Sequence, residues 1–347
     1  MGTIEHIAKW NKDSCTWEEP GLLDMGHSFS ISHYETVLND PFDGMNYIII
    51  AGGSRLERNT SNYSKINDRI YRMDNVINHY KNQNGNYNIQ CFFIDKDAPI
   101  IESAKKFAEY IDSIASLPNT KTISIMGVSK CGTMCFYTPR FFKCDESFDK
   151  VNIFNVAAPY LGTKFASPTL IVPEIYDYAI KTLGNNHMGN FLYNRLLSMY
   201  KNGCSYSHMD YDISLIDGIG DEFKHSYDGE FIRKMFCSEN VDAIREIHSF
   251  KNFTTRADEK SLPEALATFN YWGVGLCLLN NIFFGGKADG LVPYESQKSI
   301  DDILHMESIH LASSHHDVNT NIRVCNEILS ELDKTIGPTL RLKNKKY

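Results

Sequence analysis

A run of apolar and β-branched residues, Thr122–Met126, ends abruptly in the hexamer Gly-Val-Ser-Lys-Cys-Gly at residues 127–132. An apolar run that is followed by Gly-x-Ser and then by small residues predicts a strand, a sharp turn and a helix in immediate succession. Such a turn lifts the serine hydroxyl clear of the sheet and leaves the next backbone N–H to stabilise an oxyanion. The hexamer therefore makes Ser129 a candidate nucleophile.

One position of the hexamer departs from the usual pattern of this turn. Glycine normally stands two residues after the serine, whereas this chain has Cys131 there and Gly132 next. Cysteine is small, but its Cβ adds crowding at a tight turn. The alternative interpretation is a strand that ends in an ordinary Gly/Ser turn, and the hexamer alone does not separate the two.

Apolar runs recur along the chain at the spacing of a parallel sheet with helical connections. Predicted strands cover residues 46–50, 88–94, 121–126, 151–157, 246–253 and 308–312. Predicted helices cover residues 64–83, 99–117, 133–143 and 320–333. Strands that alternate with helices at this spacing indicate right-handed βαβ units. We therefore expect an α/β fold with a mostly parallel central sheet flanked by helices.

The stretch at residues 166–245 differs in character from the flanking sequence. It is dominated by tyrosine, asparagine and charged residues, and it has helical segments at 174–182 and 190–201. We expect this stretch to be an inserted helical cap, with residues 1–165 and 246–347 forming the α/β core. The chain has 347 residues, which is long enough for such a core and insert.

Composition and charge exclude several classes of protein. Apolar residues make up 42% of the chain and charged residues 22%, as in ordinary globular proteins. The net charge of −8 argues against a nucleic-acid partner, because nucleic-acid-binding surfaces are basic. The nine cysteines are odd in number and scattered, which favours reduced thiols over disulfides or a zinc site. The sequence has no evident signal peptide and no run of about 18 apolar residues, so we expect a cytoplasmic protein.

Five short segments, in chain order, resemble the α/β-hydrolases, in particular their triacylglycerol lipase and carboxylesterase branch. They are Ala-Gly-Gly at 51–53, the hexamer at 127–132, Ala-Pro-Tyr-Leu-Gly-Thr-Lys-Phe-Ala at 158–166, Gly-Gly-Lys-Ala-Asp-Gly-Leu-Val-Pro at 285–293, and His-His-Asp at 315–317. The chain departs from the family at the loop after residue 50, which lacks the family's histidine, and at Cys131.

The chemistry of such an enzyme needs a serine, a carboxylate and a histidine, and this chain supplies them in that order. The histidine takes the proton of the serine hydroxyl, and the carboxylate holds the histidine in the right tautomer. The resemblance implies Ser129, Asp289 and His315 in these roles. Asp289 also reads as an ordinary turn residue before glycine. His316 is the alternative base, and we prefer His315 because it gives the family's His-x-Asp pattern.

The resemblance also implies an oxyanion hole made of backbone N–H groups. We expect these donors to come from Lys130 and from Gly53 or Ser54. Some related lipases carry a structural calcium ion near the histidine loop, where Asp317 stands and Asp258 could be a partner. We favour reading these two as unrelated surface carboxylates, and we expect no metal and no cofactor.

The sequence thus predicts a serine hydrolase that cleaves carboxylic (acyl) esters through a Ser-His-Asp triad and an acyl-enzyme. An acyltransferase, a thioesterase or amidase with the same triad, and a non-catalytic binding protein of the same fold are the alternatives. The expected partner is a small-molecule or lipid ester. Transient contact with a membrane surface and the oligomeric state are left open.

Overall fold

The computed structural model describes most of the chain from residue 100 onward and several strands before it. The described residues are 5–11, 16–23, 45–53, 87–94, 100–163, 168–203, 236–257, 271–315, 318 and 322–336. The chain divides into two compact units, which are described separately. The first comprises residues 1–156, 238–253 and 318–347, and the second comprises residues 157–237 and 254–317.

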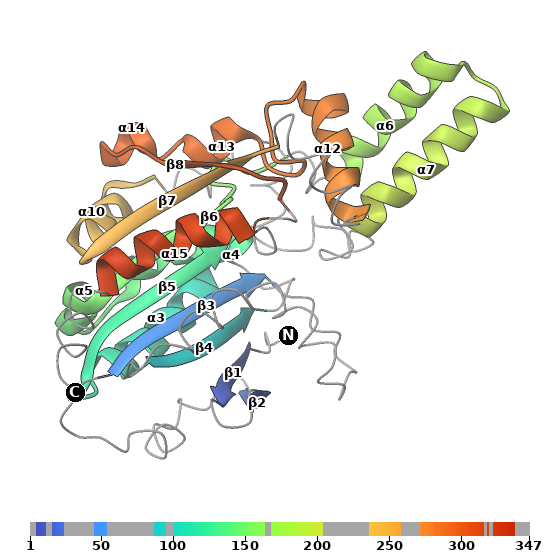
Figure 1. The fold of residues 1–347 in the computed structure, drawn as a ribbon. Helices are drawn as coiled ribbons and strands as arrows, with labels where there is room; N and C mark the ends of the chain where they lie inside the picture. The colour runs from blue at the N-terminus through green and yellow to red at the C-terminus, as the bar shows by residue number, and fades with distance from the viewer. Residues whose placement is uncertain are drawn as a thin grey trace. The chain divides into compact units, whose positions relative to one another are not determined.

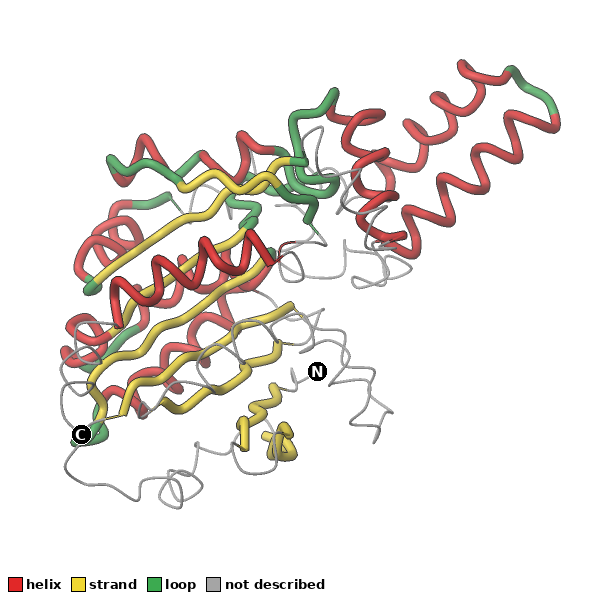
Figure 2. The backbone as a smooth tube through the Cα atoms, in the orientation of Figure 1, coloured by secondary structure: helices red, strands yellow, loops and turns green. Residues whose placement is uncertain are grey.

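The first unit is built on a mostly parallel sheet (Figures 1 and 2). The strands in chain order are β1 (Glu5–Asn11), β2 (Thr16–Leu23), β3 (Met45–Gly53), β4 (Tyr87–Ile94), β5 (Thr120–Val128), β6 (Val151–Val156) and β7 (Ser249–Arg256). In space their order is β2-β1-β4-β3-β5-β6-β7. Strands β4, β3, β5, β6 and β7 pair in parallel, whereas β1 pairs antiparallel with both β2 and β4. The predicted mostly parallel sheet is therefore confirmed.

Helices cover both faces of this sheet, which is why its central strands are continuous apolar runs. The helices of the first unit are α3 (Ile100–Ala115), α4 (Lys130–Tyr137), α5 (Asp145–Lys150), α10 (Ser238–Glu246) and α15 (Ile322–Ile336), with a 3-10 turn at Thr138–Phe141. Helix α15 lies in front of the strands in Figure 1, and α3 and α4 lie behind them. The side chains of Phe107 and Tyr110 on α3 pack on Phe92 of β4, with ring centroids 4.5 and 5.7 Å away.

The second unit is mainly helical. Its elements are α6 (Pro168–Leu183), α7 (His187–Gly203), α12 (Tyr271–Phe284), α13 (Tyr294–Lys298), α14 (Asp301–Leu304) and β8 (Ile309–Ala312). Strand β7 runs past Phe253 into this unit, where β8 is its neighbour. Helices α6 and α7 form a hairpin (Figure 1), and Ile175, Leu196 and Leu279 join it to α12 in one buried apolar cluster. No helix in the described part of the chain is both long and apolar enough to cross a membrane.

All six predicted strands are present, and the strand order β4-β3-β5-β6-β7-β8 is that of the α/β-hydrolase fold. Two boundaries are clearly wrong. The strand expected at 246–253 begins at Ser249, because Glu246 ends α10, and it continues to Arg256. The helix expected at 133–143 begins at Lys130, and its α-helical part ends at Tyr137 before the 3-10 turn. The helix expected at 64–83 lies outside the described residues. The cap at 166–245 stays a prediction; its two expected helical segments correspond to α6 and α7.

Candidate active site

Ser129 lies between β5 and α4, at a backbone conformation that few side chains adopt. Its φ is 55° and its ψ is −129°. A non-glycine residue in such a region costs of order 1–3 kcal/mol and persists only when its surroundings fix it. Two backbone hydrogen bonds contribute to this: the N–H of Ser129 donates to Val156 O at 2.9 Å, and the N–H of Gly132 donates to Ser129 O at 2.8 Å. The predicted strand, sharp turn and helix thus meet at this serine.

The space around the turn is as restricted as the glycine pattern indicates. A Cβ on Gly127 would lie 2.8 Å from Asn155 Oδ1, 2.8 Å from Cys135 Sγ and 2.9 Å from Cys131 O, all closer than real Cβ contacts. Cys131 itself is completely buried, so its small side chain fits where glycine is usual. Burial raises the pKa of the Cys131 thiol to about 12, which keeps it protonated at neutral pH. Its sulfur is therefore a packing group, unsuited to compete with Ser129 as a nucleophile.

Two of the predicted oxyanion donors, Gly53 and Lys130, lie at the same strand ends as the serine. Gly52 of β3 pairs with Val128 of β5, so Gly53 and Ser129 are each the next residue along neighbouring parallel strands. Lys130 is the first residue of α4, and the first N–H groups of a helix have no partner within the helix. The first unit thus brings Gly53, Ser129 and Lys130 to one edge of its sheet.

Asp289 lies in a tight turn that follows α12 in the second unit. Ala288 and Pro293 form an isolated antiparallel bridge across this turn. The side-chain Oδ1 of Asp289 accepts the N–H groups of Leu291 at 3.0 Å and Val292 at 2.8 Å. Asp289 is therefore a turn residue, as one interpretation of the sequence had it, but only one of its carboxylate oxygens bonds to the turn.

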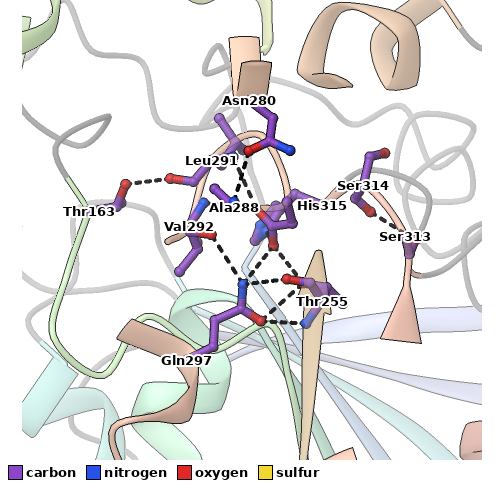
Figure 3. A network of polar contacts seen from close by, with 11 residues as sticks. Thr163, Thr255, Asn280, Ala288, Leu291, Val292, Gln297, Ser313, Ser314 and His315 are labelled. Carbon is purple, nitrogen blue, oxygen red and sulfur yellow. Dashed lines mark hydrogen bonds and ion pairs between the residues drawn. The ribbon is translucent and has the colours of Figure 1, made fainter. Parts of the chain in front are cut away.

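The other oxygen, Oδ2, contacts His315, which follows β8. Figure 3 shows His315 with Thr255, Gln297 and Val292 in the surrounding network of polar contacts. The distance from His315 Nδ1 to Asp289 Oδ2 is 2.8 Å, and the backbone N–H of His315 donates to Asp289 O, also at 2.8 Å. The Asp289 side chain is 0% exposed and that of His315 is 12% exposed. An ionised carboxylate only accepts hydrogen bonds, so Nδ1 carries the hydrogen and Nε2 of the neutral ring is an acceptor.

Two further side chains donate to Asp289 Oδ2, and no motif in the sequence pointed to either. They are Thr255 of β7, whose Oγ1 lies 2.6 Å away, and Gln297 of α13, whose Nε2 lies 3.2 Å away. Both residues are buried. Thr255 stands 34 residues from Asp289 in the chain, and no local motif links the two. Only the fold brings them together.

Residues 161–163 also form hydrogen bonds to the region of the chain that carries Asp289. Thr163 Oγ1 donates to Leu291 O within this turn. Ser296 Oγ accepts the N–H of Leu161 at 3.0 Å and donates to Gly162 O at 2.8 Å. The segment at 158–166, which resembles an α/β-hydrolase motif, thus connects its Leu-Gly-Thr residues to the loop that holds the predicted acid.

The remaining predicted positions are Ser54, Asp258, His316 and Asp317, and they lie outside the described residues. In the part of the chain that the structure describes, no group of three or more His, Cys, Asp or Glu side chains is arranged to hold a metal ion. Within a single unit, the structure brings together Asp289 and His315; Ser129 belongs to the other unit and is described with it.

No protein-family model and no curated protein matches the sequence. Among solved structures, the chain is similar to the mature lipase BlEst2 of Bacillus licheniformis, with 13% identity, a TM-score of 0.42, and coverage of 84% of this chain and 93% of that one. It is also similar to a Listeria innocua gene product, with 12% identity, a TM-score of 0.44, and coverage of 84% and 95%. A carboxylesterase of Nitrososphaera gargenis has 10% identity, a TM-score of 0.42, and coverage of 85% and 92%. Likeness at this level says nothing of the chemistry of this chain.

Proposed function

We propose that this chain is a serine hydrolase that cleaves carboxylic esters of acyl groups, with Ser129 as nucleophile, His315 as base and Asp289 as acid. The observation that supports it most is the 2.8 Å contact between His315 Nδ1 and Asp289 Oδ2. A buried carboxylate that orients a partly exposed imidazole is the arrangement that general-base catalysis by histidine requires. The strained turn at Ser129 is a second, independent sign, because backbone strain concentrates at functional sites.

The proposed reaction has two steps that balance without a cofactor. In the first, Ser129 Oγ attacks the ester carbonyl while its proton passes to His315 Nε2; the C–O bond to the alcohol then breaks, and the alcohol leaves with that proton. In the second, water gives a proton to His315 and attacks the acyl-enzyme, and the acid product leaves as Ser129 recovers its hydrogen. Asp289 stabilises the imidazolium in both steps.

The developing negative charge on the carbonyl oxygen needs preorganised donors. The proposed donors are the N–H of Lys130, at the start of α4, and the N–H of Gly53, the last residue of β3, or of Ser54, the next residue in the sequence. Losing one such donor typically slows an acyl-transfer enzyme about 100- to 1000-fold. Because these donors belong to the backbone, their placement depends on the geometry of the strand ends.

A graded series of p-nitrophenyl acyl esters tests the proposal and measures the preferred acyl chain length. Hydrolysis that the Ser129→Ala variant lacks supports the ester hydrolase. An added alcohol that diverts the acyl group into a new ester instead indicates an acyltransferase, and preference for thioesters or amides indicates those hydrolases. A folded protein with no turnover of any of these would contradict the proposal and favour a binding protein.

A further inference from the structure

The carboxylate of Asp289 accepts more hydrogen bonds than the turn around it supplies. Among the described residues it accepts five hydrogen bonds, two at Oδ1 and three at Oδ2. Only one of the three at Oδ2 comes from His315. We propose that Thr255 and Gln297 are positioning residues, which hold Oδ2 of Asp289 in place against His315. This inference rests on the proposed hydrolase function, because it assigns these side chains a part in that reaction.

The orientation of the Gln297 amide is fixed by Thr255. Its Oε1 accepts the backbone N–H of Thr255 at 2.7 Å. Its Nε2 therefore points to the opposite side, where it lies 3.2 Å from Asp289 Oδ2, 3.0 Å from Thr255 O and 3.2 Å from Val292 O. A flipped amide would leave the Thr255 N–H facing a donor and bring an oxygen against the carboxylate. The amide of Gln297 thus presents a donor to Asp289 in only one of its two orientations.

The hydroxyl of Thr255 has two acceptors within reach and one hydrogen. Asp289 Oδ2 lies 2.6 Å from it and Gln297 Oε1 lies 3.0 Å from it. The shorter contact, to a charged acceptor, is the stronger one, so the hydrogen belongs to Asp289. Gln297 Oε1 is already satisfied by the Thr255 N–H. Thr255 therefore serves the carboxylate twice, by donating its own hydroxyl hydrogen and by orienting the amide of Gln297.

These contacts prevent rotation of the Asp289 carboxylate about its Cβ–Cγ bond. Rotation would separate Oδ1 from the N–H groups of Leu291 and Val292, and it would remove Oδ2 from Thr255 and Gln297. Asp289, Thr255 and Gln297 are all buried, so water does not replace the lost partners. Since a misplacement of about 1 Å can slow an enzyme about 100-fold, a fixed Oδ2 matters for the orientation of His315.

The test compares two neighbouring buried threonines of β7. Thr255→Val removes the hydroxyl and keeps the shape, and Thr255→Ser restores the hydroxyl. Thr254→Val is the matched control, because Thr254 is equally buried and its Oγ1 contacts Ile309 O at 3.5 Å, away from Asp289. We expect Thr255→Val to lower kcat about 10-fold or more with little change in KM, since hydrogen bonds to charged groups are among the stronger ones. Thr255→Ser should recover most of the loss, and Thr254→Val should stay within about twofold of wild type.

A second readout does not depend on ester hydrolysis. The hydrogen on His315 Nδ1, observed by NMR in 15N-histidine-labelled protein and assigned by its absence in His315→Ala, reports the contact with Asp289 directly. Its resonance should move in Thr255→Val, return in Thr255→Ser and stay in place in Thr254→Val. If wild type hydrolyses no ester, the proposed function fails, but this comparison still decides whether Thr255 and Gln297 position the carboxylate.

Equal kcat values and equal resonances in Thr255→Val and Thr254→Val would overturn the inference. Should Thr255→Val not fold, Gln297→Met takes its place. Methionine has nearly the same length, but it offers no donor to Asp289 and no acceptor to the Thr255 N–H. We expect kcat to fall about 10-fold or more in that variant and the His315 resonance to move, because hydrogen bonds to charged groups are among the stronger ones. Wild-type kcat and an unmoved His315 resonance in Gln297→Met would contradict the inference.

Discussion

The turn at Ser129 and the turn at Asp289 are both tight, but different forces hold them. The Ser129 turn depends on close packing and on backbone hydrogen bonds: a larger group at Gly127 would clash with its neighbours, and the serine sits at a φ of 55°. The Asp289 turn depends on hydrogen bonds to one carboxylate, donated from its own turn, from β7, from α13 and from His315. A turn held by packing and backbone hydrogen bonds should tolerate loss of a polar side chain, and a turn held by hydrogen bonds to a side chain should not.

The largest effect on activity is expected for Ser129→Ala, which also tests whether the Ser129 turn tolerates the loss of a polar side chain. Alanine keeps the shape of the turn, so folding and thermal stability should be close to wild type. The hydroxyl is lost, so ester hydrolysis should fall about 10⁴-fold or more, as in other triad deletions. Steady-state kinetics and a thermal melt measure the two effects. Retention of a tenth of wild-type activity would mean that Ser129 is not the nucleophile. Ser129→Gly is a useful companion, because it should raise stability by about 1 kcal/mol by relieving the positive φ.

The next largest effect is expected at the histidines after β8. His315→Ala removes the group that contacts Asp289 and should lower activity by a factor of about 10³ to 10⁴. It should also loosen the Asp289 turn, which loses a donor, and thereby lower the melting temperature. His316→Ala is the control and should reduce activity much less. The reverse order of the two variants would assign the base to His316.

A substitution that crowds the Ser129 turn should lower activity less than the loss of Ser129 or His315 does, and it should lower the free energy of unfolding more. In Gly127→Ala the new methyl group meets Asn155 Oδ1, Cys135 Sγ and Cys131 O at 2.8–2.9 Å. Overpacking of this kind costs about 1–3 kcal/mol, which urea unfolding can measure. Ser124→Ala on the same strand is the control, because it makes a buried side chain smaller. Equal stabilities for the two variants would show that the turn is not held by close packing.

The same contrast explains what the sequence could and could not predict. Strand β5, the Ser129 turn and α4 follow one another directly in the chain, so they were visible as one continuous pattern. The contact between Asp289 and His315 could be predicted because each lies in a short motif that resembles a known family. The hydrogen bonds from Thr255 and Gln297 to Asp289 could not be predicted, because bonds at separations of 34 and 8 residues leave no periodic signal in the sequence.

Boundaries failed for a related reason. The sequence predicts the start of β7 at Glu246, because Ile247 fits the alternation of apolar and polar residues. Such an alternation does not mark the residue at which a strand begins. In the structure, α10 runs to Glu246, and the N–H of His248 donates to Phe148 O at 2.8 Å before β7 begins. Helix α12 was also missed, because its glycine and asparagine residues interrupt the apolar run. One of them, Asn280, accepts the N–H of Ala288 at 2.8 Å and so has a structural use.

The central claim is that Ser129 is activated by His315, and covalent labelling tests it most directly. A fluorophosphonate probe reacts with an activated serine hydroxyl, and mass spectrometry of the digested protein identifies the residue that carries it. We predict a single adduct on Ser129, no adduct in Ser129→Ala, and labelling of Ser129 slowed by orders of magnitude in His315→Ala. Folded wild-type protein that stays unlabelled, or that carries the adduct on another residue, would contradict the account.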